Sequence, residues 1–398
     1  MADPVPPRPW LSIVGIGEDG LDGLTSGARA ALDEADIVFG GDRHLKLGKV
    51  EARGSAWPIP FSTEPLLALR GKRVAALVSG DPFWFGAGSS LAKQLAREEW
   101  RAFPAPSCFS LAASRLGWPL EEATCLGLHA APFETLRPHL QPGSRLLCLV
   151  ADAAAPARLA AYLSDTGFGD SRVIVLEALG GPHERIRTAR ADAFAIEDIA
   201  VPVMVAFQAE GGPALPRTPG LPDALFTHDG QITKSPIRAL TIAALAPCIG
   251  ERLWDIGAGS GSISVEWCLA GGVAIAIETR ADRAGNIRAN AARFGLAHRL
   301  GVVEGRAPEA LAGLALPDAI FIGGGADAAL LEIALAALRP GGRLVANAVT
   351  LETETLLMRA FAENGGSLLR LDLATAQPLG GMQGWQPSRP LLQWSFTR

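Results

Sequence analysis

The stretch LWDIGAGSG, residues 253–261, decides the fold of the second half of the chain. Residues 253–256, apolar except for Asp255, have the composition of a buried strand, and the chain then enters the glycine loop GAGSG, residues 257–261. A helical pattern follows through Leu269. Because glycine has no Cβ, the backbone N–H groups of such a loop can approach a ligand closely. Strand, glycine loop and helix in this order predict the ligand-binding edge of a Rossmann-like sheet.

An acidic residue, Glu278, follows the next predicted strand, 273–277. A carboxylate at that place can accept hydrogen bonds from both hydroxyls of a ribose. A dinucleotide would favour a third glycine where this chain has Ser262, whereas S-adenosylmethionine carries no phosphate and tolerates the serine. We therefore favour S-adenosylmethionine over a dinucleotide, with Asp255 close enough to face its ammonium or sulfonium charge. A tight turn without a ligand is the alternative interpretation.

The remainder of the second half alternates between helices and strands. Ser235 and Pro236 indicate a helix start, with the serine as N-cap and the proline at the first helical position. A helix is expected over 283–294, strands over 302–303 and 319–322, a helix over 330–338, and a strand over 343–346 after the turn RPGG. Two further helix–strand pairs are expected to fill the chain to its end.

The first half also predicts α/β structure. Buried strands are expected over 11–16, 74–78 and near 101–105, and each runs into a loop rich in Gly, Ser or Pro: GIGEDG, SGDP and PSCFS. In open α/β sheets such loops share the carboxyl edge, where ligands bind. Later strands are expected over 146–150, 173–177 and 203–207. The Pro- and Gly-rich segment 211–222 predicts a linker between domains 1–210 and 223–398.

Composition excludes several classes of protein. The 398 residues, 48% hydrophobic and 19% charged, predict two or three folded domains and exclude a disordered chain. The net charge of −5 gives no basic field for nucleic acid, and no apolar run is long enough to span a bilayer. The N-terminal MADPVPPRPW is unlike a signal peptide, and the widely spaced cysteines suit reduced thiols, so we expect a cytoplasmic protein. No His or Cys spacing predicts a metal site.

Only five of the 36 Lys and Arg residues are Lys. Genomic base composition explains such a bias, and a site for polycarboxylates, which arginine binds in a bidentate way, is the alternative. The candidate cations for such a substrate cannot be ranked from the sequence; they are Arg43, Arg115, Arg238 and Arg389.

Longer segments carry a resemblance to a known family. In the first half, VGIGEDG (14–20), FGGDRHL (39–45), VSGDPFWFG (78–86) and PSCFSLAASRLGW (106–118) resemble the tetrapyrrole methylases. In the second half, HDGQITKSPIRA (228–239), WDIGAGSGSISVEW (254–267), VEGRAPEAL (303–311) and FIGGG (321–325) complete a resemblance to the precorrin-6Y C5,15-methyltransferases (decarboxylating) of cobalamin biosynthesis.

The resemblance implies an α/β chain in which a bilobed tetrapyrrole-methylase domain precedes a Rossmann-like class I methyltransferase domain. It implies that the first domain methylates C5 of precorrin-6Y. The second would methylate C15 and remove the C12 acetate carboxyl to give precorrin-8. S-adenosylmethionine would bind once in each domain, without a metal, and the substrate would be a tetrapyrrole rather than a nucleic acid or a membrane. Relatives of both domains assemble, so a homo-oligomer is expected.

The resemblance also assigns donor-binding positions. In the second domain they are Thr233, Gly257, Ala258, Gly259, Ser260, Gly261, Glu278 and Ala307; in the first they are Gly15, Gly17, Gly80, Asp81, Pro82, Ser107 and Ser110. Arg306 departs from the wider methyltransferase class, where an acid at this place contacts the adenine, and leaves Ala307 as a backbone contact.

Few residues suggest themselves for acid–base work. His228 and Asp229 precede Thr233, and Asp81 lies in the first domain; they are the candidate catalytic residues. A solvated linker residue is the alternative for His228, and an Asx turn for Asp81.

Substrate contacts are expected at two loops. Gly323, Gly324 and Gly325 follow a strand at the ligand edge and make room for the macrocycle, or form a plain turn. Phe83 and Trp84 either stack on a flat ring or pack in the core.

Other functions remain open from the residues alone. They are a relative with one active domain, a module that binds the cofactor or a corrinoid without turnover, an RNA methyltransferase and a nicotinamide dehydrogenase. The negative charge counts against RNA, and Ser262 against a nicotinamide cofactor.

Overall fold

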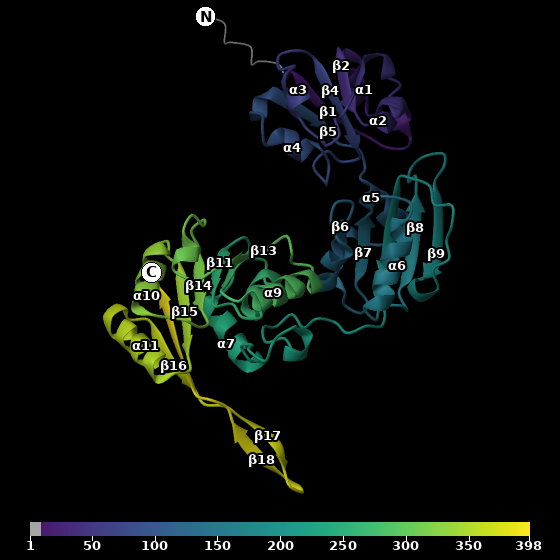
Figure 1. The fold of residues 1–398 in the computed structure, drawn as a ribbon. Helices are drawn as coiled ribbons and strands as arrows, with labels where there is room; N and C mark the ends of the chain where they lie inside the picture. The colour runs from purple at the N-terminus through teal and green to yellow at the C-terminus, as the bar shows by residue number, and fades with distance from the viewer. Residues whose placement is uncertain (1–8) are drawn as a thin grey trace, which may run out of the picture. The chain divides into compact units, whose positions relative to one another are not determined.

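A computed structural model describes residues 9–398. The first eight residues of the N-terminal stretch MADPVPPRPW, which the sequence predicts not to be a signal peptide, lie outside the described residues. The chain forms two compact units (Figure 1). The first comprises residues up to 131 and 139–213, and the second 132–138 and 214–398. The boundary after Pro213 falls inside the expected linker 211–222. Within residues 9–398, no helix is long and apolar enough to cross a membrane.

The first unit begins with a parallel sheet in the order β3-β2-β4-β1-β5. Its strands are β1 (Leu11–Ile16), β2 (Ile37–Gly40), β3 (Gly54–Ala56), β4 (Val74–Ser79) and β5 (Trp100–Phe103). The helices are α1 (Ser26–Glu34), α2 (Asp42–Leu47), α3 (Glu64–Leu67) and α4 (Gly88–Ala92). β1 and β4 lie in the middle, and five of the six residues of β4 are buried. The loops after β1, β4 and β5 therefore share one carboxyl edge, as the sequence predicts.

A second sheet completes the first unit and confirms that this half is bilobed. Its order is β6-β7-β10-β8-β9, with only the β6–β7 pair parallel. The elements are α5 (Cys108–Leu116), β6 (Ala123–Gly127), β7 (Arg145–Leu149), α6 (Ala155–Asp165), β8 (Arg172–Glu177), β9 (Arg185–Arg190) and β10 (Val203–Gln208). The strands β3, β6 and β9 were not predicted from the sequence. They lie at the edges of the two sheets, where one-sided burial leaves a weak apolar pattern.

The second unit contains a seven-stranded sheet in the order β13-β12-β11-β14-β15-β19-β16. The first five strands are parallel, and β19 is antiparallel to both of its neighbours. The strands are β11 (Arg252–Ile256), β12 (Val273–Glu278), β13 (Leu300–Glu304), β14 (Ala319–Ile322), β15 (Arg343–Ala348), β16 (Ser367–Leu371) and β19 (Leu391–Thr397). The helices are α7 (Ser235–Leu245), α8 (Ser262–Leu269), α9 (Ala281–Arg293), α10 (Ala328–Ala337) and α11 (Leu351–Asn364).

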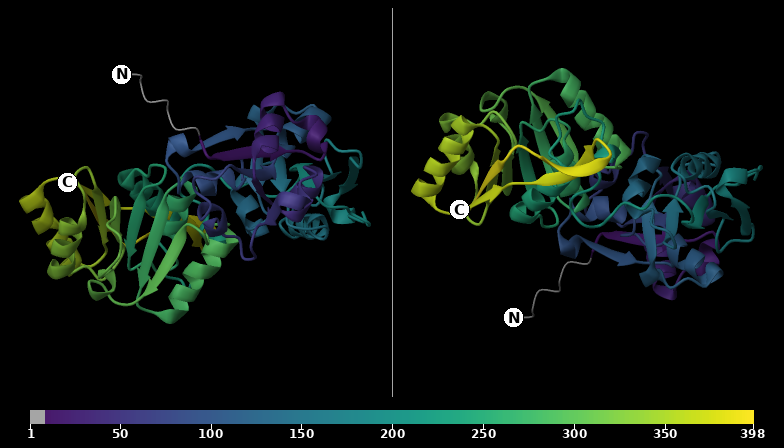
Figure 2. Two further views of the ribbon diagram at one scale, coloured as in Figure 1. Left: turned by 90° about the horizontal axis from the view of Figure 1, so that it is seen from above. Right: turned by 90° about the horizontal axis from the view of Figure 1, so that it is seen from below.

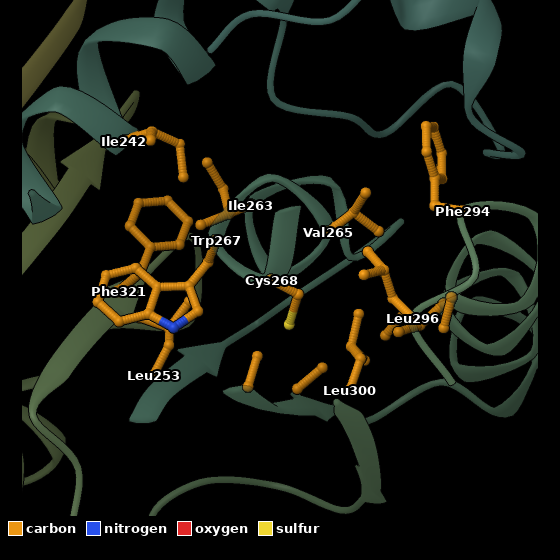
Figure 3. Packing of buried hydrophobic residues seen from close by; sticks show 14 of the residues in the cluster. Ile242, Leu253, Ile263, Val265, Trp267, Cys268, Phe294, Leu296, Leu300 and Phe321 are labelled. Carbon is orange, nitrogen blue, oxygen red and sulfur yellow. The ribbon is translucent and has the colours of Figure 1, made fainter. Parts of the chain in front are cut away.

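Helices cover both faces of this sheet. Successive residues of a strand point to opposite faces, so Leu253 packs in the core beneath α7, α8 and α9, while Trp254 packs in the core beneath α10 and α11. Figure 3 shows the first of these cores, with Val265, Trp267 and Cys268 of α8 at its centre. Residues 262–268 are all buried, as expected for a helix enclosed on every side. This enclosure fixes the glycine loop that precedes α8.

The end of the chain differs from the prediction. The first of the two expected helix–strand pairs is present as α11 and β16, but the second is wrong. Instead the chain forms a hairpin of β17 (Ala374–Leu379) and β18 (Met382–Pro387) before it returns to the seven-stranded sheet as β19. The hairpin is a separate two-stranded ribbon that extends away from that sheet (Figures 1 and 2). Gly380 and Gly381 form the two-residue connection that favours a hairpin over a helix.

A second difference concerns the start of α7. Ser235 lies inside the helix rather than capping it, and its hydroxyl donates to the carbonyl of Gly220 at 2.7 Å. This contact belongs to a segment that the sequence suggested to be a linker. Leu215 and Leu221 of that segment are 5% and 1% exposed in the core of the second unit, so it is integrated into the fold.

Candidate functional site

The first unit holds a cavity of about 540 Å³ at the carboxyl edge of its parallel sheet. Its volume suits a small-molecule ligand. Residues of both lobes line it, among them Val78 of β4 in the first lobe and Met204 of β10 in the second. Of the donor-binding positions expected in this half, Gly17, Gly80, Asp81 and Ser107 line the cavity.

The other three expected positions are not among the lining residues; they are Gly15, Pro82 and Ser110. Gly15 supports the wall from behind, because a Cβ there would overlap the carbonyl oxygen of Gly80 and come within 2.8 Å of the nitrogen of Ala105. Ser110 supports α5, since its backbone N–H donates to Ser107 Oγ at 3.1 Å and so caps the helix.

Asp81 forms the Asx turn that was its alternative interpretation. Its Oδ1 accepts the backbone N–H of Phe83 at 2.8 Å. Gly80 precedes it with φ of +55°, in the left-handed region that favours glycine. The turn therefore fixes the shape of the loop at the cavity wall, and a carboxylate oxygen remains with further acceptor capacity.

A polar cluster at the same cavity was not singled out from the sequence. His44 Nε2 lies 2.8 Å from Ser79 Oγ and 2.8 Å from Arg43 Nη2, which also donates to Ser79 Oγ at 2.9 Å. Arg43 is paired in turn with Glu18. All four residues line the cavity.

Topology explains this cluster. Glu18 follows β1, Arg43 and His44 lie on α2 after β2, and Ser79 ends β4, three neighbouring strands of one parallel sheet. Burial and the neighbouring guanidinium lower the pKa of His44 to about 4, so the imidazole is neutral at pH 7. These residues could have been predicted from their positions, because each follows or ends a strand whose carboxyl end lies at the same edge of the sheet.

In the second unit the glycine loop adopts the conformation that the sequence requires. Gly257, Gly259 and Gly261 have φ of +70°, +60° and +71°. A Cβ on Gly257 would lie 2.8 Å from the carbonyl oxygen of Gly324. The structure therefore brings the predicted substrate loop, Gly323 to Gly325, against the donor loop, and these three glycines are exposed.

Glu278 lies where the sequence places it, at the end of β12. Its Oε2 accepts the backbone N–H of Gly259 at 2.8 Å and its Oε1 accepts that of Arg280 at 3.0 Å. The side chain is 5% exposed. Each carboxylate oxygen keeps lone-pair capacity for a further donor, such as a ribose hydroxyl.

Two buried polar atoms at this loop test whether the site fits S-adenosylmethionine. Within residues 9–398, Asp255 Oδ1 and Ser260 Oγ are buried without a hydrogen-bond partner. Asp255 Oδ2, by contrast, accepts from the N–H and the hydroxyl of Ser264 at 3.1 and 2.6 Å. Burial raises the pKa of Asp255 to about 6. Unpartnered polar atoms beside a glycine loop fit a polar, cationic ligand.

The segment before α7 carries the remaining candidates. His228 Nδ1 accepts the N–H of Gly230 at 3.0 Å. Asp229 accepts the N–H of Gln231 and pairs with Arg283 at 2.9 Å, and these contacts lower its pKa. The carbonyl of Thr233 accepts a hydrogen bond from Arg238. His228 and Asp229 thus shape a turn in the described structure, and Asp229 is an ion-paired carboxylate.

The candidate cations differ in their availability. Arg238 is 0% exposed and binds Glu266 at 2.6 Å, so the suggestion that it contacts a substrate carboxylate is wrong. Arg115 pairs with Glu184 at 2.6 Å, and Arg389 is exposed in the connection between β18 and β19. Only Arg43 among the four lines the cavity of the first unit.

Two family models match the chain. The model of tetrapyrrole (corrin/porphyrin) methylases matches residues 11–195, and the model of the precorrin methyltransferase domain matches residues 224–398.

Curated relatives match over the full length. A precorrin-6Y C(5,15)-methyltransferase [decarboxylating] of Sinorhizobium sp is 50% identical over 100% of this chain and 98% of that protein. The protein of the same name from Mycobacterium tuberculosis (strain CDC 1551 / Oshkosh) is 41% identical over 98% of this chain and all of that protein. A probable cobalt-precorrin-6B C(15)-methyltransferase (decarboxylating) of Pyrobaculum aerophilum is 36% identical over 44% of this chain and 93% of that protein.

Solved structures resemble single parts of the chain. The C-terminal domain of precorrin-6Y C5,15-methyltransferase from Rhodobacter capsulatus is 61% identical, covers 46% of this chain and all of that one, and has a TM-score of 0.46. A precorrin-6Y methylase from Archaeoglobus fulgidus is 27% identical, covers 51% of this chain and all of that one, and has a TM-score of 0.41. With full-length relatives at 41% and 50% identity, the chain belongs to the precorrin-6Y C(5,15)-methyltransferase (decarboxylating) family.

Proposed function

We propose that the chain is a bifunctional methyltransferase that uses S-adenosylmethionine. It methylates precorrin-6Y at C5 and C15 and decarboxylates the C12 acetate to give precorrin-8 in cobalamin biosynthesis. The observation that carries this proposal is the full-length relationship to enzymes of that name. Two separate glycine-containing loops, one at the carboxyl edge of each parallel sheet, support it.

The two reactions are divided between the units. The first unit, matched by the tetrapyrrole methylases, methylates C5, and the second methylates C15 and releases carbon dioxide. The Pyrobaculum relative supports the division, because its name contains only the C15 reaction and the decarboxylation, and it matches 44% of the chain. One molecule of donor then binds to each unit.

In the second unit the loop from Gly257 to Gly261 approaches the donor with its backbone N–H groups. Glu278 binds the ribose hydroxyls, and Asp255 faces the positive charge of the donor. The backbone at Thr233 and Ala307 completes the site. The buried, unpartnered oxygens of Asp255 and Ser260 support these assignments, since a bound ligand satisfies them.

In the first unit the donor occupies the cavity between the lobes. Gly17, Gly80, Asp81 and Ser107 form its wall there, and Gly15 and Ser110 support that wall. Pro82 follows Asp81 in the same loop. The neutral His44 leaves Arg43 and Glu18 as a balanced pair, so the cluster adds no net charge that would repel a cationic donor.

The donor supplies a methyl group on a sulfonium, and the nucleophile is an electron-rich meso carbon of the substrate. The residues of the chain align the two molecules and exclude water, which are the main requirements of such a displacement. Decarboxylation uses the conjugated macrocycle as the electron sink. Asp81 in the first unit, and His228 and Asp229 in the second, are the candidates to accept the proton that the methylated carbon loses.

The substrate contacts follow from the exposed residues beside each donor site. Gly323 to Gly325 leave room for the macrocycle in the second unit, and Trp84 offers an aromatic face at the cavity of the first. We also expect the chain to act in the cytoplasm, on a free tetrapyrrole rather than on nucleic acid, and as a homo-oligomer. Analytical ultracentrifugation tests the assembly.

Mass spectrometry of products tests the function. Incubation of a precorrin-6Y-type substrate with the full chain and S-adenosylmethionine should add two methyl groups and remove one carbon dioxide. Calorimetric titration of the chain with S-adenosylhomocysteine should give two sites. One methyl gain would indicate a single active unit, and no methyl gain with tight ligand binding would indicate a sensor; either result contradicts the bifunctional proposal.

A further inference from the structure

The segment 220–233, called the strap below, connects the unit boundary to α7 and is held down along its length. The backbone N–H groups of Gly220 and Leu221 donate to the two carboxylate oxygens of Glu266 at 2.8 and 2.9 Å. The buried Arg238 binds the same carboxylate and the carbonyl of Leu221. Arg293 of α9 donates to the carbonyl of Leu225 at 3.0 Å. The strap is therefore part of the second unit, fixed by α7, α8 and α9.

The strap passes beside the glycine loop. The carbonyl oxygen of Gln231 lies 3.5 Å from the place that a Cβ on Gly259 would occupy. Apart from the two residues next to Gly259 in the sequence, no other part of residues 9–398 comes within 4 Å of that place. The strap then continues to Thr233, an expected donor-binding position. Its path determines where residues 228–233 lie relative to the donor loop.

One side chain links the strap directly to the loop. Asn290 on α9 is 0% exposed, and its Oδ1 accepts the backbone N–H of Thr227 at 2.8 Å. Its Nδ2 donates to the carbonyl of Thr227 at 2.9 Å and to the carbonyl of Ser260 at 2.9 Å. The carboxamide thus binds both backbone groups of one strap residue and one carbonyl of the glycine loop.

We propose that Asn290 is a positioning residue for the donor site of the second unit, holding the strap in register with the glycine loop through Thr227 and Ser260. The inference rests on the proposed donor site of that unit. Asn290 need not touch the donor or the substrate. It acts through the two segments that carry the donor-binding backbone.

The chemistry of the three hydrogen bonds explains the need for asparagine. The site requires one acceptor and two donors, and a carboxamide supplies both. Aspartate has the same shape but would face two carbonyl oxygens with a negative charge. Alanine would leave the buried carbonyl of Ser260 without its partner, which costs more than the loss of an exposed hydrogen bond. It would also release the part-buried N–H and carbonyl of Thr227.

The test compares variants of the full chain, in which the first unit serves as an internal standard. Asn290→Ala and Asn290→Asp should each raise the KM for S-adenosylmethionine in C15 methylation at least about tenfold. The KM of the same donor in C5 methylation should stay within about twofold. A second variant, Thr227→Pro, removes the N–H that donates to Asn290 but keeps the carbonyl that accepts from it. Residue 226 is already extended, as a following proline requires. This variant should shift the same KM in the same direction by about threefold.

Asn347→Ala is the matched control. Asn347 is a half-buried asparagine in the same unit whose amide donates to Thr241 at 3.1 Å and whose carbonyl accepts from Gln393 at 3.0 Å. Its removal should lower thermal stability without changing the donor KM of either reaction. Equal donor KM values for Asn290→Ala, Thr227→Pro and Asn347→Ala would overturn the inference. Absence of C15 methylation by the unaltered chain would instead contradict the proposed function.

Discussion

His44 Nε2, on α2, lies 2.8 Å from Ser79 Oγ, at the end of β4 in the first unit. Arg43 approaches both atoms, so the imidazole accepts rather than donates at Nε2. The arrangement requires a neutral imidazole, because an imidazolium would place a second positive charge against the guanidinium. The cavity wall therefore depends on the protonation state of one side chain.

Acid should destabilise the first unit through His44. Its pKa is lowered from 6.5 to about 4 in the folded chain, so the unfolded chain binds the proton more tightly. Stability from this group is complete above pH 6.5 and is lost as the pH falls toward 4. Urea unfolding followed between pH 7 and 4.5 should show a smaller pH dependence for His44→Gln than for the unaltered chain. His183→Gln, at an exposed position, should retain the full dependence; if both variants do, the assignment fails.

Donor binding to the second unit should strengthen as the pH rises through about 6. Burial raises the pKa of Asp255 to that value, Ser264 lowers it through its hydrogen bonds, and the nearby Glu278 raises it. A cationic donor favours the carboxylate, so below pH 6 binding must also remove a proton. The donor KM in C15 methylation should be about tenfold higher at pH 5 than at pH 8. Asp255→Asn should bind more weakly with a flat profile, and a profile as steep as that of the unaltered chain would exclude Asp255.

The effect of pH on the stability contribution of Asp255 is opposite to its effect on donor binding. Because the pKa of Asp255 in the folded chain exceeds the ordinary value of 3.8, the folded chain binds the proton more tightly. Its contribution to stability is therefore greatest below pH 4 and declines as the pH rises toward 6. Donor binding and stability thus respond to pH in opposite directions at this group, which separates the two effects experimentally.

The Rossmann-like unit was the more predictable part of the fold. A buried strand, a glycine loop and an acid at the end of the next strand are local patterns, and the structure places Gly257 and Glu278 as those patterns require. The hairpin β17–β18 was missed because its strands are almost entirely exposed and carry little apolar alternation. Burial, which creates the strongest sequence signal, is absent there.

The missed site residues share a different cause. The partners of these residues are distant in the sequence: His44 and Ser79 are 35 residues apart, and Asn290 is 30 residues from Ser260. No local spacing in the sequence therefore reveals these contacts. Arg238 shows the reverse error. Its charge suggested a substrate contact, whereas α7 turns it inward onto Glu266. Whether a side chain on a helix points inward depends on which face of the helix the neighbouring elements cover. For a charged residue, the local sequence does not reveal which face is covered.

Gly257→Ala should impair the second unit alone. The new Cβ would lie 2.8 Å from the carbonyl oxygen of Gly324, and the backbone φ of +70° disfavours alanine. We expect C15 methylation to fall at least tenfold in kcat/KM, by roughly 1.4 kcal/mol or more, while C5 methylation is unchanged. Gly313→Ala is the matched control, since Gly313 has φ of +76° and, apart from its two neighbours in the sequence, nothing in residues 9–398 lies within 4 Å of the new Cβ. An equal loss in both variants would show that backbone strain, rather than contact between the two loops, is responsible.

Two neighbouring aromatic residues should differ in their effect on the tetrapyrrole substrate. Trp84 lines the cavity of the first unit, is 39% exposed, and packs against Phe109 with ring centroids 5.2 Å apart. Phe83 is 44% exposed and packs against Trp100 at 5.3 Å, but it does not line the cavity. If the Trp84 ring stacks on the macrocycle, Trp84→Ala should raise the substrate KM of C5 methylation about tenfold, a stacking contribution of about 1–1.5 kcal/mol.

Phe83→Ala removes a comparable exposed ring from the same loop and should leave that substrate KM within about twofold. Steady-state kinetics at saturating donor separate the two variants, and the donor KM should change in neither. Equal increases in substrate KM would mean that the loop contributes through its general packing. An increase for Phe83→Ala alone would place the macrocycle on the Trp100 side of the loop, outside the cavity.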